Sequence, residues 1–116
     1  MIKLKRVYEA PAPSDGVRIL VERLWPRGIK KQSLEFDEWL KDVAPSTELR
    51  RWFGHDPARW KGFRDRYRAE LTRSGQIDAL KELTRLSRRK TVTLVYSAAD
   101  ETHNQAVALK AFLDEI

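Results

Sequence analysis

The chain has 116 residues, the usual length of one domain, and its 23 basic and 17 acidic side chains give a net charge of +6. It has no cysteine, which excludes disulfides, thiolate metal centres and cysteine nucleophiles. No apolar stretch is long enough to cross a membrane and no signal peptide is evident, so we expect a cytoplasmic protein without membrane contact. The basic balance favours anionic partners.

The first quarter of the chain predicts two strands separated by a loop. Residues 2–8 alternate between apolar and basic side chains, as is typical near the edge of a sheet. Residues 10–16 include two prolines and a glycine, and they form a loop too short for a crossover helix. Residues 17–25 contain a continuous apolar run, typical of a strand covered on both faces. The sequence leaves the relative direction of the two strands open.

The middle of the chain predicts helices. Trp39, Leu40 and Val43 would share one face of a helix over residues 37–43. Capping residues and glycines delimit three further helices, over residues 47–53, 57–73 and 77–88.

The end of the chain predicts a strand over residues 91–96 and a helix over residues 101–115 that Asp100 caps. We therefore expect one compact α/β domain over residues 1–116, with a small mixed, mostly parallel sheet of three to four strands flanked by helices. Ligands of open α/β sheets bind beyond the carboxyl ends of the strands. The polar residues that follow the strands over 17–25 and 91–96 therefore mark the expected site.

The first group of candidate residues comes from the end of the second strand. Arg23 and Arg27 would hold an anion, with Trp25 beside them and the backbone N–H groups around Gly28 assisting. In the alternative interpretation, Arg23 pairs with an acid such as Asp42, and Trp25 belongs to the core.

The second group follows the strand over residues 91–96. His103 is the candidate for proton transfer, Asp100, Ser97 and Asn104 would orient it, and Tyr96 and Asn104 would contact the ligand. The alternative is that these residues only cap and fasten a turn. A Ser–His–Asp triad has little support, because no Gly-x-Ser-x-Gly motif is present.

A metal site is not expected. The two histidines, His55 and His103, are far apart in sequence and show no ligand spacing of a known type. His55 is better interpreted as part of the helix cap formed with Asp56 and Pro57. No cofactor is expected either.

Basic side chains on the helix over residues 57–73 offer a second function. They form two stripes, one of Lys61, Arg64 and Arg68 and one of Arg59, Arg66 and Arg73. Binding of nucleic acid or of an acidic protein through this surface is the alternative to a solvated face with ion pairs. The aromatic residues of the helix are spaced as core residues, so they are poor candidates for base stacking.

Four segments, VERLWPRGIKK, DEWLKDVAPSTELRRWFGHDPARW, FRDRYRAEL and LVYSAADETHNQAVALKAFL, closely resemble the YeaO-like family, a bacterial domain of unknown function. The resemblance covers nearly the whole chain and implies a cytoplasmic α/β domain without an assigned activity. It also implies that the arginine-bearing strand lies beside the strand that leads into Ser-Ala-Ala-Asp. The characteristic polar residues of the family fall here on Arg18, Arg23, Trp25, Pro26, Arg27, Gly28, Lys41, Ser46, His55, Tyr96, Asp100, His103 and Asn104.

Two positions depart from the pattern of the family. Glu22 stands where aspartate is expected, and Ala99 stands where lysine is expected. If that lysine takes part in chemistry in other members, the chemistry is impaired here.

The sequence thus predicts a small anionic, phosphate-bearing ligand in a cleft at the C-terminal ends of the strands over 17–25 and 91–96. It leaves open whether the cleft is catalytic and whether the protein forms oligomers. The alternative is a nucleic-acid or acidic-protein binding module that uses the basic helices.

Overall fold

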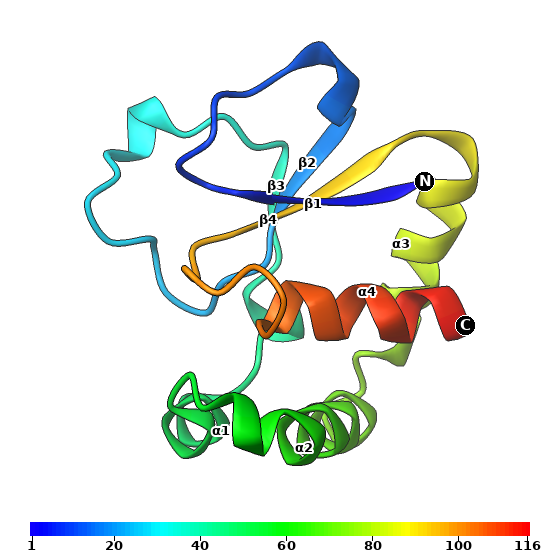
Figure 1. Cartoon of the computed structure of the whole chain (residues 1–116). Helices are drawn as coiled ribbons and strands as arrows, with labels where there is room; N and C mark the ends of the chain where they lie inside the picture. The colour runs from blue at the N-terminus through cyan, green and yellow to red at the C-terminus, as the bar shows by residue number, and fades with distance from the viewer.

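Four parallel strands form one sheet in the order β1-β4-β2-β3 in the computed structural model, which describes residues 1–116 (Figure 1). The strands are β1 Ile2–Arg6, β2 Val17–Leu20, β3 Glu38–Trp39 and β4 Val92–Tyr96. β4 pairs in parallel with β1 on one side and with β2 on the other. The first two strands are therefore parallel but not adjacent, and the expected α/β class with a mostly parallel sheet is confirmed.

Four helices complete the fold: α1 Thr47–Phe53, α2 Trp60–Arg73, α3 Ile77–Arg89 and α4 Gln105–Glu115. α4 lies next to the sheet, and α1 and α2 form a further layer beyond it (Figure 1). The first three helices lie close to their expected ranges because local signals delimit them. Ser46 caps α1 by accepting a hydrogen bond from the Leu49 N–H, and Gly54 ends α1 in the left-handed conformation. None of the helices has the length and apolar character needed to span a bilayer.

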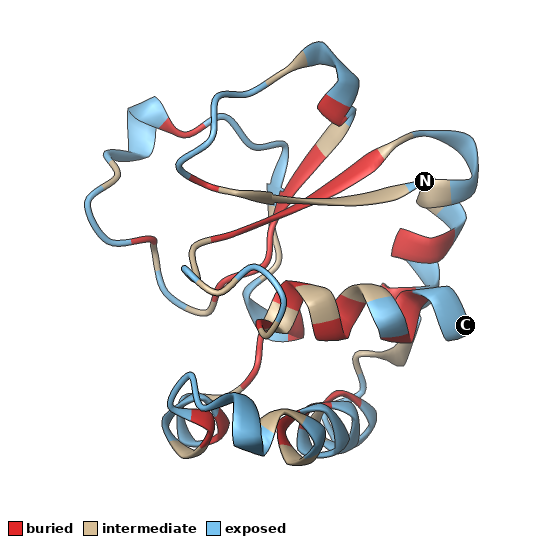
Figure 2. Cartoon of the chain, in the orientation of Figure 1, coloured by how far each residue is buried: buried red, intermediate tan, exposed pale blue.

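The helices cover only one face of the sheet. The main core joins alternate residues of β2 and β4, such as Ile19 and Leu94, to apolar residues of all four helices. The opposite face packs on a smaller cluster around Leu20 and Val95, to which no helix contributes. The long segment between β2 and β3 covers this second face instead, with Trp25 among its contacts. Figure 2 shows burial concentrated along the central strands and on the inner sides of the helices.

The prediction of a helix over residues 37–43 is wrong. Residues 38 and 39 form an edge strand that pairs with β2, and residues 41–43 form a short 3-10 turn. Trp39 packs in the small cluster and Leu40 packs against the main core, so the two side chains point to opposite faces as in a strand. Pairing with β2 therefore decides the conformation of this segment, although its apolar spacing also fits a helix.

The second strand is shorter than the range 17–25 expected from the sequence. The regular ladder of β2 ends at Leu20, although the Val21 N–H still donates to the Val95 carbonyl at 3.1 Å. Glu22 is buried just beyond this point. Its carboxylate bonds to the Ser97 N–H and to the Gln105 side chain, just beyond the end of the ladder.

The hydroxyl of Tyr67 provides a test of the packing between α2 and the segment before α1. Tyr67 is fully buried, its hydroxyl donates to the Val43 carbonyl, and burial raises its pKa above the ordinary value. Tyr67→Phe is expected to lower the free energy of unfolding by about 1–2 kcal/mol, because the buried carbonyl loses its donor. Urea denaturation measures this loss. Tyr8→Phe is the matched control, because Tyr8 is half exposed, and an equal loss in both variants would contradict the prediction.

Candidate functional site

A cleft of about 440 Å³ opens where β2 and β4 end and the chain approaches α4. It is lined by polar residues from these ends and by residues of the α1–α2 layer, among them Glu22, Arg50, His55, Ser97, Asp100, His103, Asn104 and Gln105. The pairing of β2 with β4 brings the two strand ends together, which confirms their expected adjacency. Phe53 and Phe63 form an apolar part of the wall.

The carboxylate of Glu22 organises the floor of the cleft. Its Oε1 accepts hydrogen bonds from the Ser97 N–H at 2.7 Å and from the Ser97 hydroxyl. Its Oε2 accepts a bond from the side-chain amide of Gln105 at 3.0 Å. Glu22 therefore ties the end of β2 to the end of β4 and to the first residue of α4. It makes no ion pair, so these neutral donors satisfy the buried charge.

Asp100 organises the turn that precedes α4. Its Oδ1 accepts bonds from the backbone N–H groups of Thr102 at 2.9 Å and His103 at 3.0 Å. These bonds, with the Thr102 N–H first, outweigh desolvation and lower the pKa of Asp100 to about 2. Asp100 is therefore ionised at neutral pH.

The expected start of the last helix is wrong by four residues. Residues 101–104 form the turn held by Asp100, and the true N-cap is Asn104, whose Oδ1 accepts a bond from the Val107 N–H at 3.0 Å. Asn104 is buried, and its side-chain amide donates back to the Asp100 carbonyl at 2.9 Å. Asparagine and aspartate cap helices equally well, and here Asp100 accepts from the turn while Asn104 accepts from the first turn of α4.

His103 lies between this turn and α2. Its Nδ1 is 3.0 Å from Asp100 Oδ2 and 3.0 Å from the Thr102 hydroxyl, and its ring meets Trp60 edge to face at 5.4 Å. No protein group bonds to its Nε2, so this nitrogen is available to a ligand. The Ser97 hydroxyl bonds to Glu22 and not to His103, so Ser97, His103 and Asp100 do not form a triad.

Arg50 and His55 bring basic side chains to the cleft from the other layer. Arg50 belongs to α1, and its side chain makes no hydrogen bond or ion pair. His55 follows the end of α1 and has a φ of 56°, a conformation that is rare outside glycine and often found at functional sites. Arg50 was not expected from the sequence, because a surface arginine on a helix carries no local signal.

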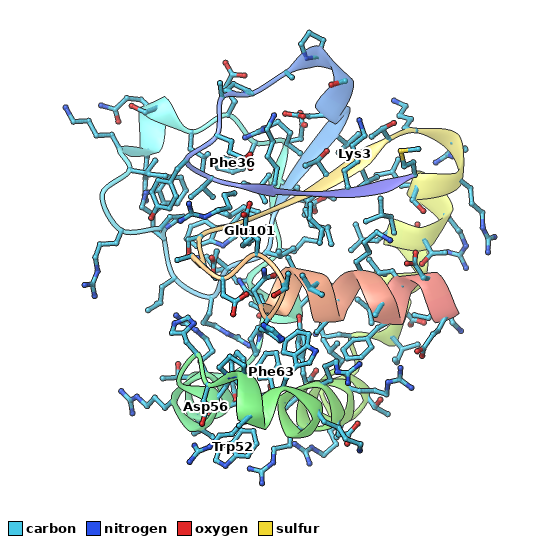
Figure 3. The ribbon with its side chains drawn as sticks, viewed as in Figure 1. Lys3, Phe36, Trp52, Asp56, Phe63 and Glu101 are labelled. Carbon is cyan, nitrogen blue, oxygen red and sulfur yellow. The ribbon has the colours of Figure 1, made fainter.

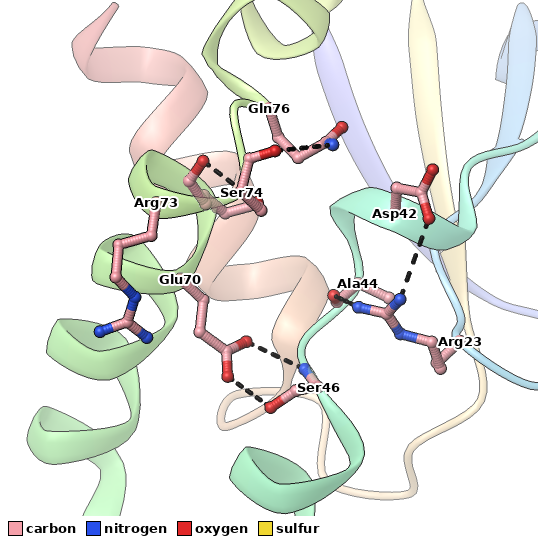
Figure 4. Close-up of a pocket in the computed structure, with 9 residues that line it drawn as sticks. Arg23, Asp42, Ala44, Ser46, Glu70, Arg73, Ser74 and Gln76 are labelled. Atoms are coloured by element: carbon pink, nitrogen blue, oxygen red, sulfur yellow. Dashed lines mark hydrogen bonds and ion pairs between the residues drawn. The ribbon is translucent and has the colours of Figure 1, made fainter.

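The structure does not bring Arg23 or Arg27 into this cleft. Arg23 lines a neighbouring hollow of about 340 Å³, where its Nη2 donates to the Ala44 carbonyl at 2.7 Å and its Nη1 is 3.9 Å from Asp42 (Figure 4). Arg27 is exposed, and its side chain makes no hydrogen bond or ion pair. The two guanidinium groups therefore do not form a clamp beside His103. Their binding of a ligand stays a prediction.

The remaining expected residues, Trp25, Gly28 and Tyr96, do not line the cleft. Trp25 donates from Nε1 to the Ile29 carbonyl at 2.6 Å and packs 5.5 Å from Trp39 on the far face of the sheet. Gly28 lies in the same turn with a φ of 79°. Tyr96 is buried at the end of β4, and burial raises its pKa. No cluster of three or more histidine, aspartate or glutamate side chains is arranged to hold a metal ion.

The strand order and the polar cleft define a small parallel α/β domain, and comparison with known proteins shows its family. The whole chain, residues 1–116, matches the family model DUF488-N3i, described as the inactive DUF488-N3 subclade. It is 46% identical over 112 residues to the uncharacterized protein YeaO of Escherichia coli K12, and the aligned residues cover 97% of this chain and 96% of YeaO. The uncharacterized protein Rv3073c of Mycobacterium tuberculosis is 42% identical over 113 residues, with 97% and 93% covered.

The chain therefore belongs to the DUF488-N3i family, and its resemblance to YeaO-like proteins is confirmed. No solved structure matches it.

Proposed function

We propose that the cleft between the ends of β2 and β4 and the α1–α2 layer binds a small phosphate-bearing ligand. The observation that carries this proposal is the unpaired guanidinium of Arg50, which lines the same cleft as the free Nε2 of His103. Arginine binds phosphate oxygens in a bidentate manner, and the N-terminus of α4 adds backbone N–H groups that favour an anion.

The two carboxylates in the cleft do not oppose this proposal, because both are bonded to protein donors. Glu22 accepts from Ser97 and Gln105, and Asp100 accepts from its own turn. A ligand that carries a phosphate toward Arg50 and a hydroxyl or amino group toward the floor would complement both parts of the cleft. Asp100 would hold His103 in the orientation that presents Nε2 to the ligand.

We further propose that the cleft binds its ligand without catalysing a reaction. Ser97 is held by Glu22, so it is not poised as a nucleophile. The family description calls the subclade inactive, and Ala99 stands where the family resemblance leads us to expect lysine. A cytoplasmic location fits such a ligand and is part of the proposal.

Comparison of Arg50→Ala with Arg51→Ala, a matched control on the same helix, tests the proposal. Titration of ¹⁵N-labelled protein with inorganic phosphate is expected to shift the amide signals of residues 97–106. Arg50→Ala should weaken this binding at least tenfold, about 1.4 kcal/mol, because a charge-assisted bond is lost. Arg51→Ala removes the same charge from α1 outside the cleft and should leave the dissociation constant within about twofold. Equal effects of the two variants, or no shift in residues 97–106, would overturn the proposal.

A further inference from the structure

Three arginines recur every seven residues along α2 and the 3-10 turn Pro57–Arg59 that precedes it. Arg59, Arg66 and Arg73 are all exposed, and a spacing of seven residues places them on one side of the helix about 10 Å apart. Arg66 and Arg73 have no acidic partner, whereas Arg59 is 3.9 Å from Asp56. The three side chains therefore form a line of positive charge along the outer layer of the molecule.

An aromatic side chain from α1 lies beside this line. The guanidinium of Arg66 is 3.8 Å from the centre of the Trp52 ring, and that of Arg59 is 5.3 Å from it. The ring rests directly on α2, because a Cβ atom at Gly62 would lie 2.8 Å from it. Trp52 lies at the outer edge of the α1–α2 layer (Figure 3), beside a hollow of about 500 Å³ that Arg66 and Arg73 also line.

Arg23 extends the line beyond the end of α2. Arg73 and Arg23 line the same neighbouring hollow from opposite sides (Figure 4). The Nε of Arg23 is the only buried side-chain nitrogen or oxygen that lacks a hydrogen-bond partner. The guanidinium of Arg23 therefore has hydrogen-bonding capacity beyond its contacts with the Ala44 carbonyl and Asp42.

We infer that these residues form a binding surface for single-stranded nucleic acid. Phosphates would lie on the arginine track, which consists of Arg59, Arg66, Arg73 and Arg23. A base would stack on Trp52 after Arg66 turns from the ring to a phosphate. This surface is separate from the cleft of Arg50 and His103 and does not depend on its proposed function.

The charges of this layer support a polyanion, and its side chains favour nucleic acid over an acidic protein. Residues 46–76 carry eight basic and four acidic side chains, so they supply most of the net charge of the chain. Seven of the eight basic residues are arginines, whose planar groups match phosphate geometry. Three acids, Glu48, Glu70 and Asp42, also line the two hollows, but Glu70 is held by Ser46. A platform in a shallow hollow requires an unpaired base, which favours a single strand over a duplex.

Fluorescence anisotropy with a labelled 20-nucleotide oligothymidine, measured between 50 and 200 mM salt, tests the inference. We expect binding that weakens steeply with salt. The double variant Arg66→Glu/Arg73→Glu should bind at least tenfold more weakly at 50 mM salt. Its plot of log affinity against log salt should be shallower by about 1.4, because two phosphate contacts are lost. Trp52→Leu should weaken binding at least about fivefold and leave the salt slope unchanged.

A matched double variant distinguishes this surface from the positive charge elsewhere on the protein. Arg88→Glu/Arg89→Glu makes the same charge change at the end of α3, away from α1 and α2 (Figure 1), and should reduce affinity much less. Equal losses in the α2 and α3 double variants would overturn the inference, as would no binding at 50 mM salt. Competition by polyglutamate as effective as by unlabelled oligonucleotide would also overturn it. Circular dichroism checks that each variant folds. If Trp52→Leu does not fold, the comparison of the α2 and α3 double variants tests the inference by itself.

Discussion

Asp15→Ala is expected to lower the free energy of unfolding by about 3–5 kcal/mol, because it removes the acid from a buried ion cluster. Asp15 accepts a bond from Lys5 Nζ at 3.0 Å, from Arg18 Nη1 at 2.6 Å and from the Ala12 N–H at 3.0 Å. The side chains of Asp15 and Arg18 are only 6% and 7% exposed. Without the carboxylate, the guanidinium of Arg18 stays buried without its ion-pair partner.

Guanidinium chloride denaturation measures the effect of Asp15→Ala, and Asp114→Ala is its control. Asp114 pairs with Lys110 at 2.8 Å on an exposed helix face, so its removal should change stability by at most about 0.5 kcal/mol. If the two variants lose similar amounts, the buried cluster does not stabilise the fold as described.

The same cluster predicts how stability depends on pH. Burial alone would raise the pKa of Asp15, but bonds from the Ala12 N–H, Lys5 and Arg18 outweigh it and lower the pKa from 3.8 to about 2. A carboxyl with a lowered pKa in the folded state stabilises that state above its unfolded pKa. This contribution is present above pH 3.8 and is lost as the pH falls toward 2. The stability difference between wild type and Asp15→Ala should therefore narrow over that range, and a constant difference would contradict the assignment.

Glu22→Ala is expected to lower the free energy of unfolding by about 3 kcal/mol and to disorder the floor of the cleft. The Ser97 N–H and the Gln105 amide would both lose their acceptor, and a cavity would form beside β2. Denaturation measures the first effect, and the amide signals of residues 97–105 report the second.

Glu22→Gln is the conservative comparison for this site. It keeps the shape and the oxygen that faces Ser97, so it should cost only about 1 kcal/mol. If Glu22→Ala is as stable as Glu22→Gln, the carboxylate does not hold the strand ends together.

Local signals predict most of the fold. α1 begins after Ser46 and α2 follows the Asp56-Pro57 step, because caps act over a few residues that are adjacent in the sequence. The strand at residues 38 and 39 could not be predicted, since its conformation depends on bonds to β2. The start of α4 was missed because both Asp100 and Asn104 are suitable caps, and the sequence does not show that Asp100 accepts from a separate turn before the helix.

The candidate site follows the same division. The adjacency of the two strands was implied by the resemblance to the YeaO-like family, and the pairing of β2 with β4 confirms it. The general rule for α/β sheets predicts only that a site lies beyond the carboxyl ends of such strands. The directions of the arginine side chains could not be predicted. Arg23 turns to the Ala44 carbonyl because the segment before α1 passes beside it, and α1 brings Arg50 to the cleft in its place. Both facts depend on contacts between segments distant in the sequence.

A crystal structure of the protein grown with inorganic phosphate tests the central claim most directly. We expect an ordered phosphate in the cleft, within hydrogen-bond distance of the Arg50 guanidinium and of His103 Nε2. An empty cleft at a phosphate concentration that occupies other sites would contradict the proposed function. So would an Arg50 side chain that points to solvent while phosphate binds only along α2.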